Sequence, residues 1–159
     1  MKEKNIYIAI GAHGSGKSTW WDLAWHRGHL NAKKFMRINF EEIRMDLLGD
    51  ETDISSERAV ETIAYANYKQ ALSNGMENIY WDHTTHSLRE RKVLIDLAKK
   101  AGYNVFAVYF DLPKEECEKR NKSRDRTIKQ DIFDYVWKSI KDNPPQLDEG
   151  FKDIITILE

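Results

Sequence analysis

The chain has 159 residues, of which 41% are hydrophobic, so it is expected to form a single domain over residues 1–159 around one sizeable core. Its formal net charge of −1 excludes a broad basic surface of the kind that coats duplex nucleic acid. The longest early apolar run, residues 6–10, is too short for a signal peptide or a membrane span, and the one cysteine, Cys117, cannot form an intramolecular disulfide. We therefore expect a cytoplasmic protein that makes no membrane contact.

Short apolar runs alternate with longer helical patterns along the chain, which is typical of β-α-β units. In chain order, the predicted elements are a strand (5–10), a helix (17–26), a strand (34–38), a helix after residue 39, a helix (54–74), a strand (79–82), a helix (87–102), a strand (105–110), two helices (113–124 and 132–140) and an edge strand (154–158). This order predicts a three-layer α/β/α fold with a mostly parallel sheet of four to five strands.

Two of the predicted helices begin with capping boxes. Asn39 precedes Glu42 by three residues, and Ser87 precedes Glu90 by the same interval. Each of these helices comes shortly after a strand, and open parallel sheets bind ligands in the crevice outside the carboxyl ends of their strands. We therefore look for chemistry in the residues that follow strand ends.

Residues 11–18, Gly-Ala-His-Gly-Ser-Gly-Lys-Ser, match the pattern G-x-x-x-x-G-K-S/T between a predicted strand and a predicted helix. The glycines allow successive backbone N–H groups to point inward, and the helix start adds its positive dipole end, so the loop suits anionic phosphates. Lys17 is expected to reach the β- and γ-phosphates of ATP and Ser18 to bind Mg²⁺ through its hydroxyl. For His13 the pattern indicates no role beyond filling the loop. The residues of this segment expected to contact the nucleotide are Gly11, His13, Gly14, Ser15, Gly16, Lys17, Ser18 and Thr19.

A basic segment over residues 119–129 contains six basic residues and one acidic residue, and we predict an arginine-rich lid at about 119–130. Arg120 and Arg124 are four residues apart and are expected to share a helix face, with Arg126 shortly after them. Over a bound triphosphate these arginines would stabilise the charge that develops during transfer. The alternative is a solvated basic helix end that the helix dipole favours.

Two acids fall on the rim where the predicted strands end. Glu41, just past the second strand, could accept a proton from an acceptor hydroxyl, and Asp82, at the end of the third, could hold a Mg²⁺-bound water or steer an arginine. Arg44 lies three residues after Glu41 and should face the same crevice. The structural alternatives are a dipole-stabilised acid for Glu41, a turn residue for Asp82 and an ion pair between Arg44 and Glu41. A switch GTPase is disfavoured because the sequence lacks the Asn-Lys-x-Asp element that binds guanine. A large motor ATPase needs a longer chain than 159 residues. The class that remains is a small phosphotransferase.

Together these motifs resemble the P-loop polynucleotide 5′-hydroxyl kinases of the bacteriophage kinase–phosphatase type, within a broader group of small kinases of AAA type. The resemblance implies a P-loop NTPase fold of the nucleotide-kinase-like class. The resemblance covers nearly the whole chain, and the matching segments are 11–20, 38–44, 81–84, 120–124 and 144–151. It implies that Glu41 is the general base, that Arg44 binds the phosphate 3′ to the reacting nucleotide, and that Arg124 contacts the ATP phosphates. The sequence departs from the family at Glu41, where the family has Asp, and at Phe40, where it often has Arg. No Asp-x-Asp-x-Thr motif of the phage phosphatase occurs, which implies a kinase module alone.

We therefore predict an ATP- and Mg²⁺-dependent enzyme that moves the γ-phosphate of ATP to the 5′-hydroxyl of a DNA or RNA end, an end-processing activity of the kind used in repair. Lys17, Glu41, Arg44, Asp82 and Arg124 are the predicted catalytic residues. A small-molecule kinase acting on a nucleoside, sugar or antibiotic hydroxyl is the first alternative, because it would use the same ATP half. The second is an ATP-binding module without enzymatic activity, in which Glu41 and Asp82 would be idle.

Overall fold

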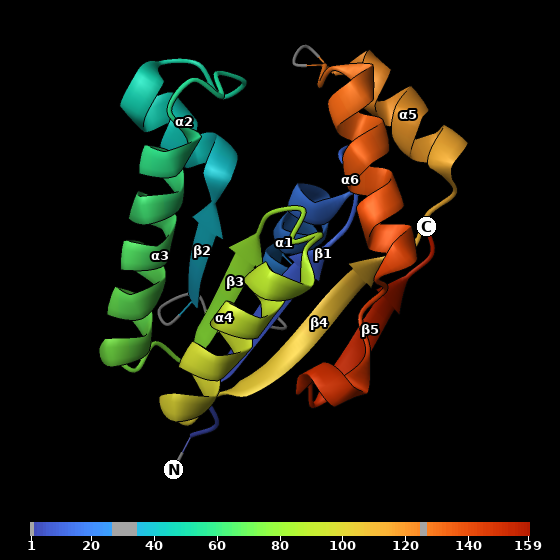
Figure 1. Cartoon of the computed structure of the whole chain (residues 1–159). Helices are drawn as coiled ribbons and strands as arrows, with labels where there is room; N and C mark the ends of the chain where they lie inside the picture. The colour runs from blue at the N-terminus through green and yellow to red at the C-terminus, as the bar shows by residue number, and fades with distance from the viewer. Residues whose placement is uncertain (1, 27–34, 125–126) are drawn as a thin grey trace.

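The computed structural model describes residues 2–26, 35–124 and 127–159 (Figure 1). The strands are β1 (Asn5–Ile10), β2 (Phe35–Asn39), β3 (Asn78–Asp82), β4 (Asn104–Phe110) and β5 (Asp153–Ile157). The helices are α1 (Lys17–His26), α2 (Phe40–Leu48), α3 (Glu57–Ser73), α4 (Leu88–Lys100), α5 (Lys114–Ser123) and α6 (Gln130–Asp142), with a short 3-10 helix at Leu147–Glu149. The predicted elements are confirmed within a few residues, except that residue 34, the first of the predicted second strand, lies outside the described residues.

The five strands form one parallel sheet in the order β2-β3-β1-β4-β5. β1 lies at the centre, where Ile8 faces Trp81 of β3 on one side and Ala107 of β4 on the other. Because all strands run the same way, their carboxyl ends lie along one edge of the sheet. The chain is therefore a P-loop NTPase-like α/β fold, as predicted, and β5 is an edge strand.

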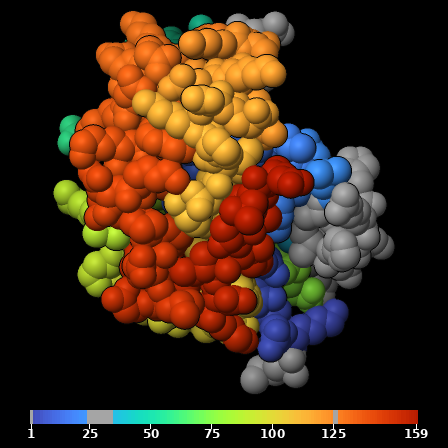
Figure 2. Space-filling model, turned by 90° about the vertical axis from the view of Figure 1, so that its right-hand side faces the viewer, coloured from blue at the N-terminus to red at the C-terminus, as the bar shows by residue number. Residues whose placement is uncertain are grey.

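Helices cover both faces of the sheet (Figure 1). On one face, buried side chains of α3 and α4 pack with those of β1, β3 and β4 around Trp81, which is fully buried. On the other face, Trp20 and Trp21 of α1 pack against Tyr80, and Cys117 of α5 is buried in the same cluster. Figure 2 shows β5 and the C-terminal residues on one side of the molecule, below α5. Within the described residues, no helix is long and apolar enough to cross a bilayer.

The helix predicted over 54–74 starts later, at Glu57. The delay has a local cause: the side chain of Asp53 accepts hydrogen bonds from the backbone N–H of Ser55, and Asp50 does the same for Thr52. Such Asp turns compete with the helix for backbone groups, so the chain stays in turns until Glu57.

A fully buried arginine, Arg91 of α4, fixes the loop that follows β3. Its guanidinium donates to the carbonyl oxygens of Thr85 and His86 at 3.3 Å each, and to both carboxylate oxygens of Glu149 at 3.2 and 3.0 Å. It also donates to the carbonyl of Asn143 at the end of α6. Thr85 has a positive φ of 45°, a strained backbone for a β-branched residue, and the arginine stabilises it in that conformation.

Candidate active site

A cavity of about 630 Å³ opens at the carboxyl edge of the sheet. Its walls come from the phosphate loop, the start of α2, the loop after β3, the end of α5 and the C-terminal end of β5. The residues predicted for the site that line it are His13, Gly14, Ser15, Gly16, Lys17, Ser18, Thr19, Glu41, Arg44, Asp82, Arg120 and Arg124. Gly11, the first residue of the loop, is not among the lining residues, and Arg126 lies outside the described residues.

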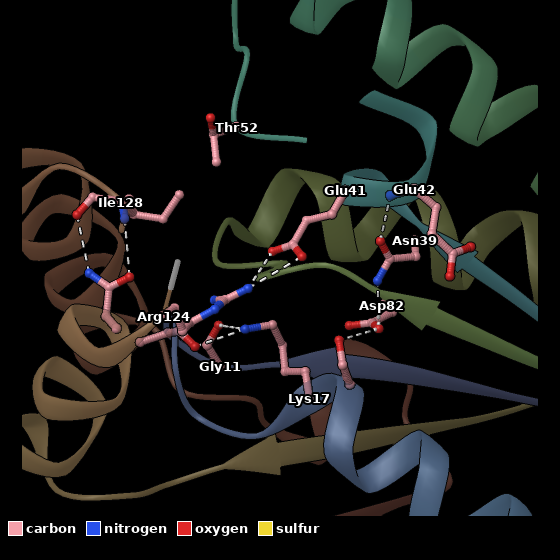
Figure 3. Close-up of polar contacts among 12 residues, drawn as sticks. Gly11, Lys17, Asn39, Glu41, Glu42, Thr52, Asp82, Arg124 and Ile128 are labelled. Atoms are coloured by element: carbon pink, nitrogen blue, oxygen red, sulfur yellow. Dashed lines mark hydrogen bonds and ion pairs between the residues drawn. The ribbon is translucent and has the colours of Figure 1, made fainter. Parts of the chain in front are cut away.

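Lys17 is the first residue of α1, and its side chain turns back onto the phosphate loop. Its ammonium group donates to the carbonyl oxygens of Gly11 at 3.2 Å and Ala12 at 2.8 Å (Figure 3). Burial lowers its pKa to about 8, although the nearby carboxylates of Asp82 and Glu41 favour the charged form. The lysine is thus held by its own loop, in a place where an arriving phosphate could replace the two carbonyls as its partners.

The loop packs closely on α5 at Gly14. This glycine has φ +79°, and a Cβ built on it would lie 2.5 Å from the carbonyl oxygen of Cys117 and 3.0 Å from the amide nitrogen of Asn121. A side chain at position 14 is therefore excluded both by backbone conformation and by space. The close contact couples the phosphate loop to the helix that begins the lid.

Asp82 is the centre of a buried polar network between β2, β3 and α1. Its Oδ2 accepts from Ser18 Oγ at 3.2 Å, from Asn39 Nδ2 at 2.8 Å and from Arg37 at 2.9 and 2.6 Å (Figure 3 draws the first two). Arg37 also donates to Ser18 Oγ at 2.9 Å and to Glu42 at 2.9 Å. Asp82 is 4% exposed, so these cations and donors replace the water that it has lost.

Arg37 was not predicted from the sequence. The signal was present: an arginine stands inside an apolar strand, two residues before Asn39, so both side chains point to the same face. The parallel register places Asn39 beside Asp82, and Arg37 then reaches the same carboxylate. Of the two roles open for Asp82, the one in this structure is to steer an arginine.

Glu41 and Arg124 meet across the cavity. One terminal guanidinium nitrogen of Arg124 donates hydrogen bonds to both carboxylate oxygens of Glu41, to Oε1 at 3.0 Å and to Oε2 at 3.3 Å (Figure 3). The expectation that Arg120 and Arg124 share a helix face is wrong, because α5 ends at Ser123 and Arg124 has an extended backbone with φ −79° and ψ 144°. Arg120 stays on the helix and pairs with Glu116 at 3.2 Å.

A buried asparagine stabilises the backbone around the end of α5, just before Arg124. The amide of Asn121, 2% exposed, donates to the carbonyl of Ile128 at 3.1 Å and accepts from its N–H at 3.2 Å (Figure 3). These two hydrogen bonds join the last turn of α5 to Ile128, two residues before α6 begins. They connect the two ends of the segment that the sequence predicts as a lid.

Arg44 lines the cavity, but its ion pair differs from the alternative considered above. Its Nε and one terminal nitrogen donate to the two carboxylate oxygens of Glu57 on α3, at 2.6 and 2.8 Å. The partner is therefore Glu57 and not Glu41. This two-point contact fixes the guanidinium plane at the cavity wall.

His13, for which the sequence indicated only a filling role, lies at the cavity. Its Nδ1 is buried with no hydrogen-bond partner among the described residues. Burial, assisted by the positive charges of Lys17 and Arg124, lowers its pKa to about 3, so the ring is neutral at physiological pH.

A family model, AAA_33, described as an AAA domain, matches residues 6–145, almost the whole of the fold described above. The chain belongs to this family of P-loop kinase domains. A chain of the solved Pnkp1/Rnl/Hen1 complex is 26% identical to it with a TM-score of 0.64, covering 82% of this chain and 42% of that one. Kti12 of Chaetomium thermophilum, solved with ADP-AlF3, superposes with a TM-score of 0.73 at 12% identity, covering 96% and 88% of the two chains.

A putative kinase from Chloroflexus aurantiacus is 16% identical, with a TM-score of 0.69 and coverage of 99% and 86%. The similarity to Kti12 and to this putative kinase establishes the fold. This P-loop kinase domain spans less than half of the matched chain in the Pnkp1/Rnl/Hen1 complex. Membership in the family supports a phosphotransferase and implies the use of ATP.

Proposed function

We propose that this P-loop kinase domain is a polynucleotide 5′-hydroxyl kinase that transfers the γ-phosphate of ATP to a DNA or RNA end. The observation that carries the proposal is the meeting of Glu41 and Arg124 at 3.0 Å in the cavity that Lys17 also lines. A phosphoryl group placed there would have a lysine and an arginine on its oxygens and a carboxylate beside the incoming hydroxyl. The 26% identity to a chain of the Pnkp1/Rnl/Hen1 complex supports the choice of acceptor.

The proposed reaction transfers one phosphoryl group and one proton. The acceptor 5′-oxygen forms a bond to the γ-phosphorus, while the bond from that phosphorus to the β,γ-bridging oxygen breaks and ADP leaves. Glu41 accepts the hydroxyl proton, and Arg124 and Lys17 bind the equatorial and bridging oxygens as charge moves onto them. Arg44, fixed by Glu57, contacts the acceptor phosphate nearest to the reacting end.

The donors beside the phosphate loop fit a magnesium ion. The Ser18 hydroxyl and the Asp82 carboxylate are hard oxygen ligands 3.2 Å apart, and Ser18 lies in the position that binds Mg²⁺ in P-loop enzymes. If bound by these residues, such an ion would supply positive charge for the β- and γ-phosphates. Arg37 contacts both oxygens in this structure, so an ion bound there would share these ligands with the guanidinium.

The acceptor class is tested with labelled ATP and a panel of acceptors. A 5′-hydroxyl oligonucleotide, its 5′-phosphorylated counterpart, nucleosides and sugars are incubated with the protein, and transfer of label is measured. We expect label on the 5′-hydroxyl oligonucleotide and none on the counterpart whose end is blocked. Label on the small molecules alone would overturn the polynucleotide assignment and support a small-molecule kinase, and no label on any acceptor together with intact ATP binding would support a binding module.

Two substitutions test the residue roles. Glu41→Gln keeps size and hydrogen bonding but removes the proton acceptor, so we expect turnover to fall by about 100-fold or more with little change in ATP binding. Near-normal turnover would leave Glu41 as a dipole-stabilised acid only. Arg44→Ala should raise the acceptor KM much more than the ATP KM, and an equal effect on both would contradict an acceptor role.

A further inference from the structure

Tyr135 of α6 is an aromatic residue outside the hydrophobic core, and it is 68% exposed. Its ring meets the imidazole of His86 edge to face, with 5.7 Å between the centroids and 80° between the planes. His86 is in turn tied to α6, because its Nδ1 lies 2.9 Å from Ser139 Oγ and the Ser139 hydroxyl donates to the His86 carbonyl oxygen at 3.2 Å. The tyrosine ring therefore has a fixed neighbour, while most of its surface is open to solvent.

The contacts of Tyr135 place it beside the cavity. Tyr135 and Ser139 are four residues apart, so the face of α6 that bonds to His86 also carries the tyrosine. Thr84, two residues before His86, lines the cavity, and two peptide units span at most about 7.6 Å. Ile128, two residues before α6 begins, lines the cavity as well. The part of α6 that carries Tyr135 thus lies between two segments of the cavity wall.

The surface around Tyr135 suits a base better than a phosphate. The charged residues about one helical turn away on either side, Asp131 and Lys138, have opposite signs, so they give a phosphate chain no net attraction. An exposed aromatic ring, by contrast, binds single strands by stacking on their bases, whatever the identity of the base. Arg44 of α2 is the residue proposed to contact the acceptor phosphate, and α6 stands across from α2 at the carboxyl edge of the sheet (Figure 1).

We propose that Tyr135 stacks on an unpaired base of the acceptor strand, 3′ to the reacting nucleotide. The inference rests on the proposed function, and it extends the acceptor site beyond the cavity that holds Glu41 and Arg44. The contact with His86 restrains the ring before the strand arrives, which lowers the entropy that binding removes. A strand of several nucleotides is therefore a better acceptor than a nucleoside 3′-monophosphate, which ends before this contact.

Acceptors that differ in one base test the contact. They are a 5′-hydroxyl hexanucleotide, three versions of it with an abasic residue at the second, third or fourth position, and a nucleoside 3′-monophosphate. Stacking of one base on an aromatic side chain contributes about 1–3 kcal/mol, which is about 5- to 150-fold in affinity. We expect Tyr135→Ala to raise the KM of the hexanucleotide by about this factor and to leave the KM values of ATP and of the nucleoside 3′-monophosphate unchanged. One abasic version should show the same rise with the wild-type protein, and Tyr135→Ala should add nothing to it.

Three further variants separate stacking from other effects at position 135. Tyr135→Phe keeps the ring and should keep the wild-type KM for the hexanucleotide. Tyr135→Leu keeps apolar bulk without an aromatic face, so it should behave like Tyr135→Ala, and it serves if that variant does not fold. Leu147→Ala is the matched control and should change nothing, because Leu147 is 59% exposed but precedes β5, at the amino edge of the sheet.

The outcomes separate this contact from the proposed function. Wild-type protein that phosphorylates none of the oligonucleotides overturns both. Wild-type protein that phosphorylates the hexanucleotide overturns the contact alone if no abasic version is impaired, or if Tyr135→Ala has no effect or affects the nucleoside 3′-monophosphate equally. The slope of log affinity against log salt concentration should be the same for wild type and Tyr135→Ala, because stacking releases no counterions. A shallower slope in the variant would assign the loss to a phosphate contact and overturn the stacking.

Discussion

At the scale of single residues, Gly14 is the position where the phosphate loop tolerates least change. Gly14→Ala would combine a left-handed backbone with a contact of 2.5 Å to the Cys117 carbonyl oxygen. Gly49→Ala is a matched control, because φ there is +73° and nothing lies within 4 Å of the built Cβ. We expect the control to lose about 1 kcal/mol of unfolding free energy, and Gly14→Ala to lose more and to weaken ATP binding by at least about tenfold. Urea unfolding and calorimetric ATP titration measure both effects, and equal losses would show that the contact is relieved without cost.

Lys17 gives the protein a pH-dependent stability that can be measured without substrate. Its pKa is about 8 in the folded protein against an ordinary value of 10.5. Between these values the unfolded chain holds a proton that the folded protein has released, so the Lys17 contribution to the free energy of unfolding rises with pH. Below pH 8 the buried charge destabilises the fold by its full amount.

Lys17→Met removes this contribution, so the stability of the variant relative to wild type should fall by about 2 kcal/mol from pH 7 to pH 10. Urea unfolding of both proteins at several pH values gives the difference. The difference is the useful quantity, because buried tyrosines such as Tyr68 and Tyr80 have raised pKa values and affect both proteins alike. Parallel curves for the two proteins would show that Lys17 titrates normally.

The residues predicted from the sequence were those inside local motifs. The Gly-rich loop before Lys17 and Ser18 is recognised from consecutive residues, and the structure places residues 13–18 at one cavity. Arg37 was missed because its place at the site depends on a partner from another element, Asp82. In the same way, Glu42 and Glu90 look like capping-box partners, yet their carboxylates bond to Arg37 and His83 respectively, and only the caps from Asn39 and Ser87 are made.

At the scale of elements, the lid depends on one side chain. Asn121→Ala removes both hydrogen bonds to Ile128 and leaves the Ile128 amide without its partner. We expect faster hydrogen exchange at residues 127–129 and a loss of about 1–3 kcal/mol in unfolding free energy. Ser123→Ala is the control, because its exposed hydroxyl donates to a carbonyl of its own helix, that of Arg120, and its loss should cost less than about 0.5 kcal/mol. Unchanged exchange in Asn121→Ala would mean that other contacts hold the lid.

The elements themselves were largely predictable, because hydrophobic periodicity and caps act locally. The strands around Ile8 and Val108 are apolar runs between turn residues, and the structure confirms them. The order of the strands was not predictable, since it depends on which crossover places β3 and β4 on either side of β1. The end of α5 was predicted within one residue, but the hydrogen bonds between Asn121 and Ile128 that accompany it were not, because they join residues seven positions apart.

At the scale of the whole molecule, the near-neutral charge is a balance of two opposite segments. Residues 41–62 contain eight acidic and two basic residues, whereas residues 119–129 contain six basic and one acidic. Arginines of the basic segment and of α2 lie at the cavity, and several are paired with carboxylates. A surface that binds a long stretch of nucleic acid would need more positive charge than these paired arginines provide.

The salt dependence of acceptor binding should therefore be shallow. A single strand held through one or two phosphates gives a slope of about −0.7 to −1.4 in a plot of log affinity against log salt concentration. Fluorescence anisotropy of a labelled 5′-hydroxyl oligonucleotide, titrated at several salt concentrations, measures it. A slope steeper than about −3 would indicate an extended contact surface and contradict an enzyme that binds only the strand end.

The ion pair between Arg124 and Glu41 has a consequence for the order in which the substrates bind. Before nucleotide arrives, the carboxylate is engaged by the lid arginine, and an acceptor hydroxyl that enters first meets an occupied base. The γ-phosphate competes for Arg124 with greater charge, so nucleotide binding releases Glu41 for the second substrate. We expect ordered kinetics with ATP first, in which an unreactive acceptor analogue inhibits uncompetitively with respect to ATP. A competitive or noncompetitive pattern would show that the two substrates enter independently of this ion pair.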